Sequence, residues 1–419
     1  MDGDVLIIGG GIAGASLAFH LAARRRVLLL EREGAFGVHA TGRSAAEWSM
    51  VHATGMTRAL TGASRDFLLA PPKGFGDTPL LRARGNVIVA RAGSEPMLER
   101  LHADAAPHVP KLTRIDAKQV LALAPFVAAK VIASAIYDPT NCAIDVDALL
   151  NSFLRAAREQ NAVVRSDVAV LGGRPERDGW RVETSMGSLT VAAVVNAAGA
   201  WADDIALSFG VPALGLTPRR RTAITFEISG IGDLRGAAAL DDVATGAYLK
   251  PEGGSLMASP GDATISPACD AAPEEIDVAT AAWIAEELTG RRIERLQARW
   301  AGLRTFAADE QPVAGWEASV PGFFWLAGLG GAGLMTSPAL GAAAAAILMD
   351  GEAPSELRAR GITATDLSPQ REQLVAAERN RSATADQGIV SSAAEAGSLL
   401  FGQSARLDSN VKQSSGGGS

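Results

Sequence analysis

A glycine-rich turn near the start of the chain offers the clearest chemistry in the sequence. The apolar run Val5-Leu6-Ile7-Ile8 leads into Gly9-Gly10-Gly11-Ile12-Ala13-Gly14, and an alanine-rich stretch follows. This spacing predicts a strand, a tight turn at Gly9, a close approach of the Gly11 backbone to a pyrophosphate, and a helix that packs on the strand at Gly14. The free N–H groups and the dipole of the helix N-terminus would stabilise the phosphates. The pattern therefore indicates a dinucleotide site.

The next apolar run supports this interpretation. Val27-Leu28-Leu29-Leu30 ends in Glu31, at about the spacing where an acidic side chain accepts hydrogen bonds from a ribose. A negative charge there disfavours the additional phosphate of NADP. The structural alternative is an ordinary glycine turn in a β-α-β unit, because a lone glycine pattern also occurs by chance.

The composition limits the class of protein. The chain has 419 residues, of which 47% are hydrophobic, and a formal net charge of −7. This length allows two domains, or one nucleotide-binding domain interrupted by a second, and the charge gives no reason to expect a nucleic acid partner. Cys142 and Cys269 lack the spacing of a metal site or a disulfide framework, so neither is predicted. The longest apolar candidate, 339–349, is too short to cross a bilayer, so we expect a cytoplasmic protein without a transmembrane segment and leave peripheral membrane contact open.

Periodicity and turn residues predict the remaining elements. Helices are expected over 58–69, 96–106, 116–123 with Asp116 as N-cap, 145–159 and 274–288. Strands are expected within 79–92, 163–170, 180–184, 188–196 and 215–259. The segment 382–419 loses the apolar period and ends in a Gly/Ser run that resembles an expression linker, so a flexible tail is predicted there.

A second glycine-rich turn lies far from the first. Gly328-Leu329-Gly330-Gly331-Ala332-Gly333 precedes an alanine-rich stretch and predicts the start of a helix, with Ser337 as its cap and Pro338 at its first position. The two turns could meet around one cofactor.

Eight stretches together resemble the flavin-dependent D-amino acid oxidase and glycine oxidase superfamily, most closely its bacterial D-arginine dehydrogenase branch. They are residues 9–14, Glu31-Arg32, 41–46, Tyr137-Asp138-Pro139-Thr140, 195–201, Tyr248-Leu249-Lys250-Pro251, 300–304 and the turn at Gly330. The resemblance implies an α/β fold: a Rossmann-like FAD-binding domain of the glutathione-reductase type with an inserted α+β substrate domain built on an antiparallel sheet. The FAD-binding domain would comprise 1–78, 143–213 and 300–372, and the substrate domain 79–142 and 214–299.

The resemblance also implies a non-covalent FAD. Its pyrophosphate would lie on the first turn, its ribose at Glu31 and its adenine beside Val168, while the second turn would close on the pyrimidine edge of the flavin. The cofactor residues implied are Gly9, Gly11, Ala13, Gly14, Glu31, Arg32, Thr41, Arg43, Ser44, Ala45, Glu47, Val168, Ala198, Gly199, Trp201, Gly330, Gly331, Ala332, Gly333, Leu334 and Met335.

The activity implied is hydride transfer from the α-carbon of a D-amino acid to flavin N5. The imino acid product would hydrolyse to a 2-oxo acid and ammonia, and a quinone or another acceptor would reoxidise the flavin. Arg221 and Arg304 match the substrate-carboxylate positions of the family, and Tyr248 adds a hydroxyl. A guanidinium can hold a carboxylate through two parallel hydrogen bonds, which orients the α-carbon.

Several side-chain positions depart from the arginine-preferring pattern. Asn86 stands where a glutamate is expected, His52 where a tyrosine is expected, Glu47 where a histidine is expected, and Met335 where a glutamine is expected. We therefore expect a more open and more apolar pocket, which accepts neutral or apolar D-amino acids at least as well as basic ones. An oxidase of glycine or N-methyl amino acids that releases hydrogen peroxide is an alternative, and a catalytically silent flavin-binding scaffold is another. The sequence does not predict the oligomeric state.

Overall fold

The computed structural model describes residues 1–76, 79–231 and 233–377, so the predicted tail at 382–419 lies outside the described residues. Residues 1–371 form one compact unit, to which all the elements described below belong.

The glycine-rich start of the chain lies at the centre of the first sheet. Strand β1 (Gly3–Ile8) pairs in parallel with β2 (Val27–Leu30) on one side and with β12 (Gly187–Asn196) on the other. β9 (Val163–Arg165) extends the sheet beyond β2, β20 (Phe323–Ala327) lies parallel to the end of β12, and β19 (Val313–Trp316) pairs with β20. The antiparallel strands β10 (Val170–Glu176) and β11 (Gly179–Thr184) complete the sheet. A parallel sheet that begins with a glycine turn is the Rossmann-like arrangement expected from the sequence.

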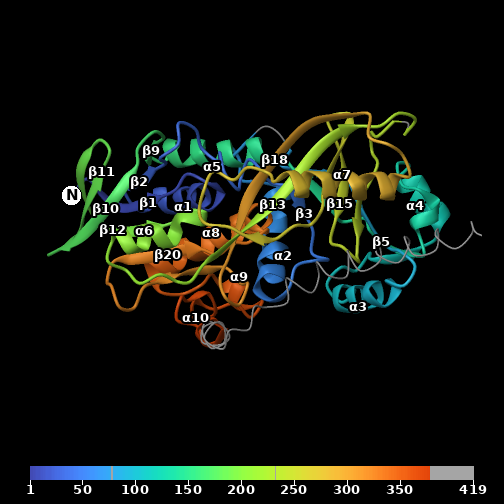
Figure 1. Ribbon diagram of the computed structural model, residues 1–419. Coiled ribbons are helices and arrows are strands. Elements are labelled where there is room, and N and C mark those ends of the chain that lie inside the picture. Colours follow the sequence, from blue (N-terminus) through green and yellow to red (C-terminus); the bar gives the residue numbers. More distant parts are fainter. Residues whose placement is uncertain (77–78, 232, 378–419) are drawn as a thin grey trace, which may run out of the picture. The chain divides into compact units, whose positions relative to one another are not determined.

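Helices bury one face of this sheet. α1 (Ile12–Ala22) packs against α5 (Val146–Glu159) and α8 (Gly333–Asp350), which Figure 1 shows beside it, and α2 (Gly55–Leu69) contacts α8. α6 (Ala202–Ser208) follows the short 3₁₀ turn Gly199–Trp201, and the short helices α9 (Ser355–Arg358) and α10 (Ala364–Leu367) come last. α8 is long and apolar enough to cross a membrane by length and composition alone, but 56% of it is buried inside the protein.

The start of α8 corrects one prediction. The helix begins at Gly333, after Ala332, so Ser337 is not its cap and Pro338 lies inside it. Proline lacks the N–H that would bond the Leu334 carbonyl, but the Ser337 hydroxyl donates to that oxygen at 3.0 Å. In addition, the Ala339 N–H donates to Ser64 Oγ of α2. These bonds allow proline to stay within the helix.

The second sheet is mostly antiparallel. Its strands are β5 (Asn86–Ala90), β6 (Thr113–Ile115), β7 (Ser134–Asp138), β13 (Thr217–Glu227), β14 (Ala239–Asp242), β15 (Tyr248–Glu252), β16 (Ser255–Ser259), β17 (Thr264–Ile265) and β18 (Arg295–Phe306). They run in the order β17-β13-β16-β15-β14-β5-β7-β6, with β18 on β13, and only β14 and β5 are parallel neighbours.

Apolar and polar residues alternate along these strands, so the second sheet has one apolar face and one polar face. Val87, Leu240, Leu249 and Ile224 enter one core with α4 (Ala117–Leu123) and α7 (Glu275–Thr289). Because successive side chains point to opposite faces, the neighbouring residues Asn86, Asp241, Tyr248 and Arg221 lie on the other face. α3 (Glu95–Ala105) covers part of that face near β5.

Most sequence-based elements are confirmed within one to three residues, including the Asp116 N-cap, which forms a capping box with Gln119. The strand expected over 163–170 ends at Arg165, because Asp167 adopts a left-handed φ of 60°. β4 (Leu81–Ala83) lies within the strands expected over 79–92, but β3 (Glu47–Trp48), β8 (Cys142–Ile144) and the small sheet that the three strands form were not predicted. The division into two discontinuous domains stays a prediction.

We expect Gly341→Ala to destabilise the fold, because a Cβ at this position would overlap the Ser16 side chain of α1 and lie 3.1 Å from its backbone carbon. Overpacking of this kind costs about 1–3 kcal/mol. Gly34→Ala is the matched control, since a Cβ added there would meet no atom within 4 Å and the φ of Gly34 is ordinary. Equal denaturant midpoints for the two variants would contradict the close α1–α8 contact.

Candidate active site

Loops and strands from both sheets enclose a cavity of about 730 Å³. Its walls include the first glycine turn, the segment 37–49, the residues after β12, the second glycine turn, and parts of β13, β14, β15 and β18. Cavities of this size are typical of small-molecule and cofactor sites. The two glycine turns thus meet at one site, as the sequence suggested.

The first glycine turn fits a pyrophosphate. Gly9 has a φ of 109°, and a Cβ there would overlap the Ala197 carbonyl. A Cβ at Gly14 would overlap the Gly9 carbonyl, so this residue allows the close packing of helix on turn. Within the described chain the amides of Gly11 and Ala13 have no acceptor, and both residues line the cavity. Unpaired amides at a helix N-terminus are what an anionic group requires.

Glu31 and Thr41 hold the backbone around this turn. The Glu31 carboxylate accepts from the Gly10 N–H at 2.7 Å and from the Glu33 N–H at 3.0 Å, and Thr41 Oγ1 accepts from the Ile12 N–H. Ser44, which also lines the cavity, has a buried hydroxyl with no hydrogen-bond partner among the described residues. A buried unpaired hydroxyl is costly unless a ligand bonds it, so it too fits a polar cofactor in the cavity.

The second glycine turn places the N-terminus of the helix α8 at the cavity. Gly330 has a φ of 55°, and a Cβ there would lie 2.6 Å from the Phe306 ring. Gly333, Leu334 and Met335 form the first turn of α8 and line the cavity. Their amides lie at the positive end of the helix dipole, where they favour negative charge.

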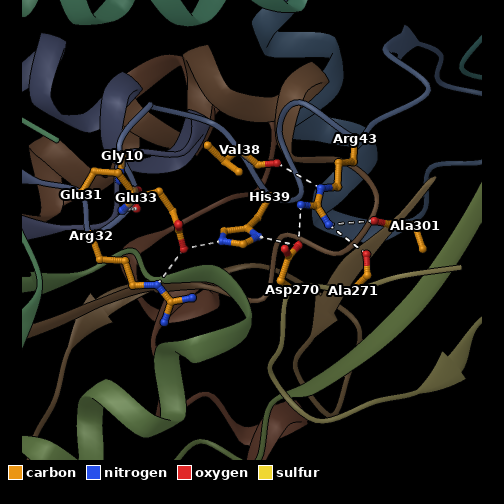
Figure 2. A network of polar contacts seen from close by, with 10 residues as sticks. All are labelled: Gly10, Glu31, Arg32, Glu33, Val38, His39, Arg43, Asp270, Ala271 and Ala301. Atoms are coloured by element: carbon orange, nitrogen blue, oxygen red, sulfur yellow. Dashed lines mark hydrogen bonds and ion pairs between the residues drawn. The ribbon is translucent and has the colours of Figure 1, made fainter. Parts of the chain in front are cut away.

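A polar network connects the first glycine turn and the segment 38–43 to residues of the second half of the chain (Figure 2). Arg43 donates to the carbonyls of Val38, Ala271 and Ala301 and forms an ion pair with Asp270 at 2.5 Å. The Arg43 side chain therefore connects the segment 38–43 to the second sheet. On the other side of the network, His39 and Arg32 both contact Glu33, and the Arg32 guanidinium lies 4.1 Å from the centre of the Trp201 ring.

The two predicted clamp arginines are neighbours. Arg221 on β13 pairs directly with Gly302 on β18, and Arg304 pairs with Arg219. Arg221 and Arg304 are therefore diagonal cross-strand neighbours on one face, and both line the cavity with Tyr248. Arg221 Nε donates to the Asp262 carbonyl at 2.5 Å and lies 3.7 Å from Asp262 Oδ1.

The environment of this pair favours an anion. Burial, and then the charge of Arg304, lower the pKa of the Arg221 guanidinium. Among the described residues no carboxylate lies within 4.0 Å of the Arg304 guanidinium. Two like charges in a partly buried cavity repel each other, and a bound carboxylate would relieve this repulsion.

Glu47 lies in the same cavity on β3. Its carboxylate makes long contacts, 3.5 Å to Arg84 Nη1 and 3.4 Å to Asn141 Nδ2. Burial, and then the negative charge of Asp241, raise its pKa to about 7, although Arg84, Lys250 and Asn141 act in the opposite direction. Glu47 is therefore a group that can change its protonation state near neutral pH.

Asp241 was missed in the sequence, and it adds a carboxylate to the wall of the pocket. It lines the cavity, and its Oδ2 lies 2.8 Å from His52 Nε2 and 2.6 Å from Asn86 Nδ2. Burial lowers the pKa of His52, but the hydrogen bond and negative charge of Asp241 outweigh this and raise it. The signal in the sequence was the acidic pair Asp241-Asp242 at the end of an apolar run, 237–240.

Three predicted site residues do not line the cavity: Gly14, Asn86 and Ala332. Gly14 packs against the first turn, Asn86 is buried behind Asp241, and Ala332 precedes α8. The residues that do line it are Gly9, Gly11, Ala13, Glu31, Arg32, Thr41, Arg43, Ser44, Ala45, Glu47, His52, Val168, Ala198, Gly199, Trp201, Arg221, Tyr248, Arg304, Gly330, Gly331, Gly333, Leu334 and Met335.

The raised pKa of Glu47 predicts a pH-dependent stability. The folded protein holds a proton on Glu47 that the unfolded chain loses above its ordinary value of 4.5, so this residue lowers the free energy of unfolding as the pH rises from 4.5 to about 7. Glu47→Gln removes the effect. We expect the variant to gain up to about 3 kcal/mol relative to the parent between pH 5 and pH 8, measured by denaturant unfolding. A constant difference across this range would contradict the assignment.

Comparison with known proteins agrees with this geometry. The sequence profile of a family described as FAD dependent oxidoreductase matches residues 4–347. The chain is 26% identical over 404 residues to the glycine oxidase of Geobacillus kaustophilus, a match that covers 87% of this chain and 95% of that protein. It is also 24% identical over 265 residues to the mitochondrial dimethylglycine dehydrogenase of Homo sapiens, of which it spans only 30%.

Solved structures show the same fold. L-proline dehydrogenase from P. horikoshii superposes with a TM-score of 0.75 at 20% identity, covering 88% of this chain and 97% of that one. The glycine oxidase of Geobacillus kaustophilus superposes with a TM-score of 0.70 at 23% identity, covering 81% and 92%. The specific resemblance to D-arginine dehydrogenase stays a prediction. The family match, together with the two glycine turns around one cavity, leads to one conclusion: this chain belongs to the FAD dependent oxidoreductase family.

Proposed function

We propose that the protein oxidises D-amino acids at the α-carbon. The substrate loses two electrons and two protons to give an imino acid, and water converts this to a 2-oxo acid and ammonia. The observation that carries the proposal is the arginine pair, in which Arg304 has no carboxylate partner among the described residues and faces the cavity that both glycine turns line. FAD, when bound, supplies the acceptor for the hydride.

The residues of the cavity can orient such a substrate. Arg221 and Arg304 would hold the α-carboxylate, and the Tyr248 hydroxyl would add a third donor. The amine must lose a proton before the α-hydrogen leaves, and the Glu47 carboxylate, with a pKa of about 7, can accept it.

The remaining details of this proposal come from the sequence. FAD is bound without a covalent link, the electrons pass to a quinone or a similar acceptor, and the protein acts in the cytoplasm. The substitutions at residues 47, 52 and 335 support a broad substrate range that includes neutral D-amino acids.

An oxidase of glycine or N-methyl amino acids is the second candidate. The relatives named glycine oxidase and monomeric sarcosine oxidase favour it, and both activities would use the same carboxylate clamp. A silent flavin-binding scaffold is disfavoured, because two neighbouring guanidiniums are costly to keep in a cavity that binds no anion.

An anaerobic screen tests the proposal directly. The purified holoenzyme is mixed with D- and L-amino acids, glycine and sarcosine, and the absorbance of the oxidised flavin is followed. We expect D-amino acids to bleach the flavin faster than their L-enantiomers. Faster bleaching by glycine or sarcosine, with hydrogen peroxide formed in air, would favour the second candidate, and no bleaching by any compound would favour the scaffold.

Arg304→Lys should weaken the carboxylate clamp while it keeps the charge. Lysine cannot form the two parallel bonds of a guanidinium, so we expect kcat/KM for the best D-amino acid to fall about 10- to 100-fold. Arg292→Lys is the control, because Arg292 is 91% exposed and pairs with Glu286 outside the cavity. Similar kcat/KM values for the two variants would argue against the clamp.

A further inference from the structure

Asp241 presents a free hydrogen-bond acceptor to the cavity. Both of its side-chain partners, His52 Nε2 and Asn86 Nδ2, contact the same oxygen, Oδ2. Among the described residues no donor bonds the other oxygen, Oδ1, although the side chain is only 17% exposed and lines the cavity. A carboxylate oxygen that lacks a partner in a confined site is best satisfied by a donor on a ligand.

The strand register places this acceptor beside the proposed clamp. Asp241 on β14 pairs directly with Tyr248 on β15, so the two side chains are cross-strand neighbours on one face. Arg221 lies on the same face, two strands beyond β15. A molecule whose carboxylate lies at the arginines and Tyr248 can therefore extend its other end toward Asp241.

Asn86 holds the carboxylate in position. Asn86 is 1% exposed, and its amide can only donate to Asp241, because an ionised carboxylate has no proton to offer. This bond directs Oδ2 toward the buried Asn86, and His52, which itself lines the cavity, contacts the same oxygen. The remaining oxygen is then the one available to the cavity.

We propose that Asp241 is a specificity-determining residue that selects substrates whose side chain ends in a hydrogen-bond donor. This inference rests on the proposed function and names its substrate class: D-amino acids that carry an amide, hydroxyl or ammonium group at the end of the side chain. Apolar side chains of equal length leave Oδ1 unpaired, and anionic side chains are repelled by Asp241.

Asp241→Asn should reverse this selectivity rather than abolish it. The buried Asn86 donor requires an acceptor, so the new amide turns its oxygen toward Asn86 and its NH₂ group toward the cavity. We expect the ratio of kcat/KM for D-ornithine, whose ammonium group can only donate, to that for D-norleucine to fall about tenfold, and the ratio for D-glutamate to D-glutamine to rise about tenfold, as expected for one hydrogen bond gained or lost. Each value is divided by that for D-alanine in the same protein.

Asp350→Asn is the matched control, because it removes the same charge from a carboxylate that pairs with Arg24 outside the cavity and is 53% exposed. Its substrate ratios should equal those of the parent. Asp241→Leu gives a second test that does not depend on amide orientation: the preference for D-glutamine over D-norleucine should disappear. Flavin content and thermal unfolding show that each variant is folded.

The outcomes separate the two proposals. If the parent oxidises D-alanine but Asp241→Asn and Asp241→Leu keep its substrate ratios, the role of Asp241 is overturned and the proposed function stands. If no D-amino acid reduces the parent flavin, the proposed function fails and this inference fails with it.

Discussion

Two neighbouring guanidiniums impose the main physical constraint on this structure. The register of β13 and β18 places Arg221 and Arg304 diagonally across one pair of strands, so their separation does not depend on loop conformation. Only Arg221 has an acidic neighbour within the described chain, Asp262. The repulsion between the two positive charges is strongest where water is scarce, and an anion that binds there is stabilised for the same reason.

The face of the second sheet that carries the two arginines also carries an acidic residue, Asp241, a few strands away. Asp241 on β14 lines the cavity and contacts His52, while Leu240 and Leu249, on the same strand or the next one, enter the apolar core under α7. Glu47, on the small sheet, adds a second carboxyl group to this part of the cavity. The alternation of side chains thus gives one sheet both a core face and a binding face. A cavity with donors at one end and acceptors at the other orients a small polar ligand before any chemistry takes place.

Whether a feature could be predicted from the sequence depends on how far apart in the chain its interacting residues lie. The turn at Gly9 and the N-cap at Asp116 depend on backbone a few residues away, and both were predicted. The fold class and the arginine pair came from the family resemblance, since nothing local distinguishes Arg221 from its neighbours Arg219 and Arg220.

Features that depend on distant partners were not predicted. The bond between Asn86 and Asp241 joins residues 155 positions apart through the parallel pairing of β5 and β14. Pro338 follows a local preference for helix starts, but the hydrogen bond of Ser337 and the contact of Ala339 with α2 override it. Sequence patterns therefore predicted the backbone turns around the site better than the polar side chains that line it.

The position of Asp241 next to Asn86 depends on the pairing of β5 and β14. The resemblance places a side-chain carboxylate at residue 86, where this chain has asparagine, and the structure has a carboxylate on the neighbouring strand. Ile88, two residues after Asn86, pairs directly with Asp241, so residues 86 and 241 are diagonal neighbours on one face. Residue 241 lines the cavity, whereas residue 86 is buried behind it. The amide at residue 86 thus holds the carboxylate that lines the cavity through a hydrogen bond.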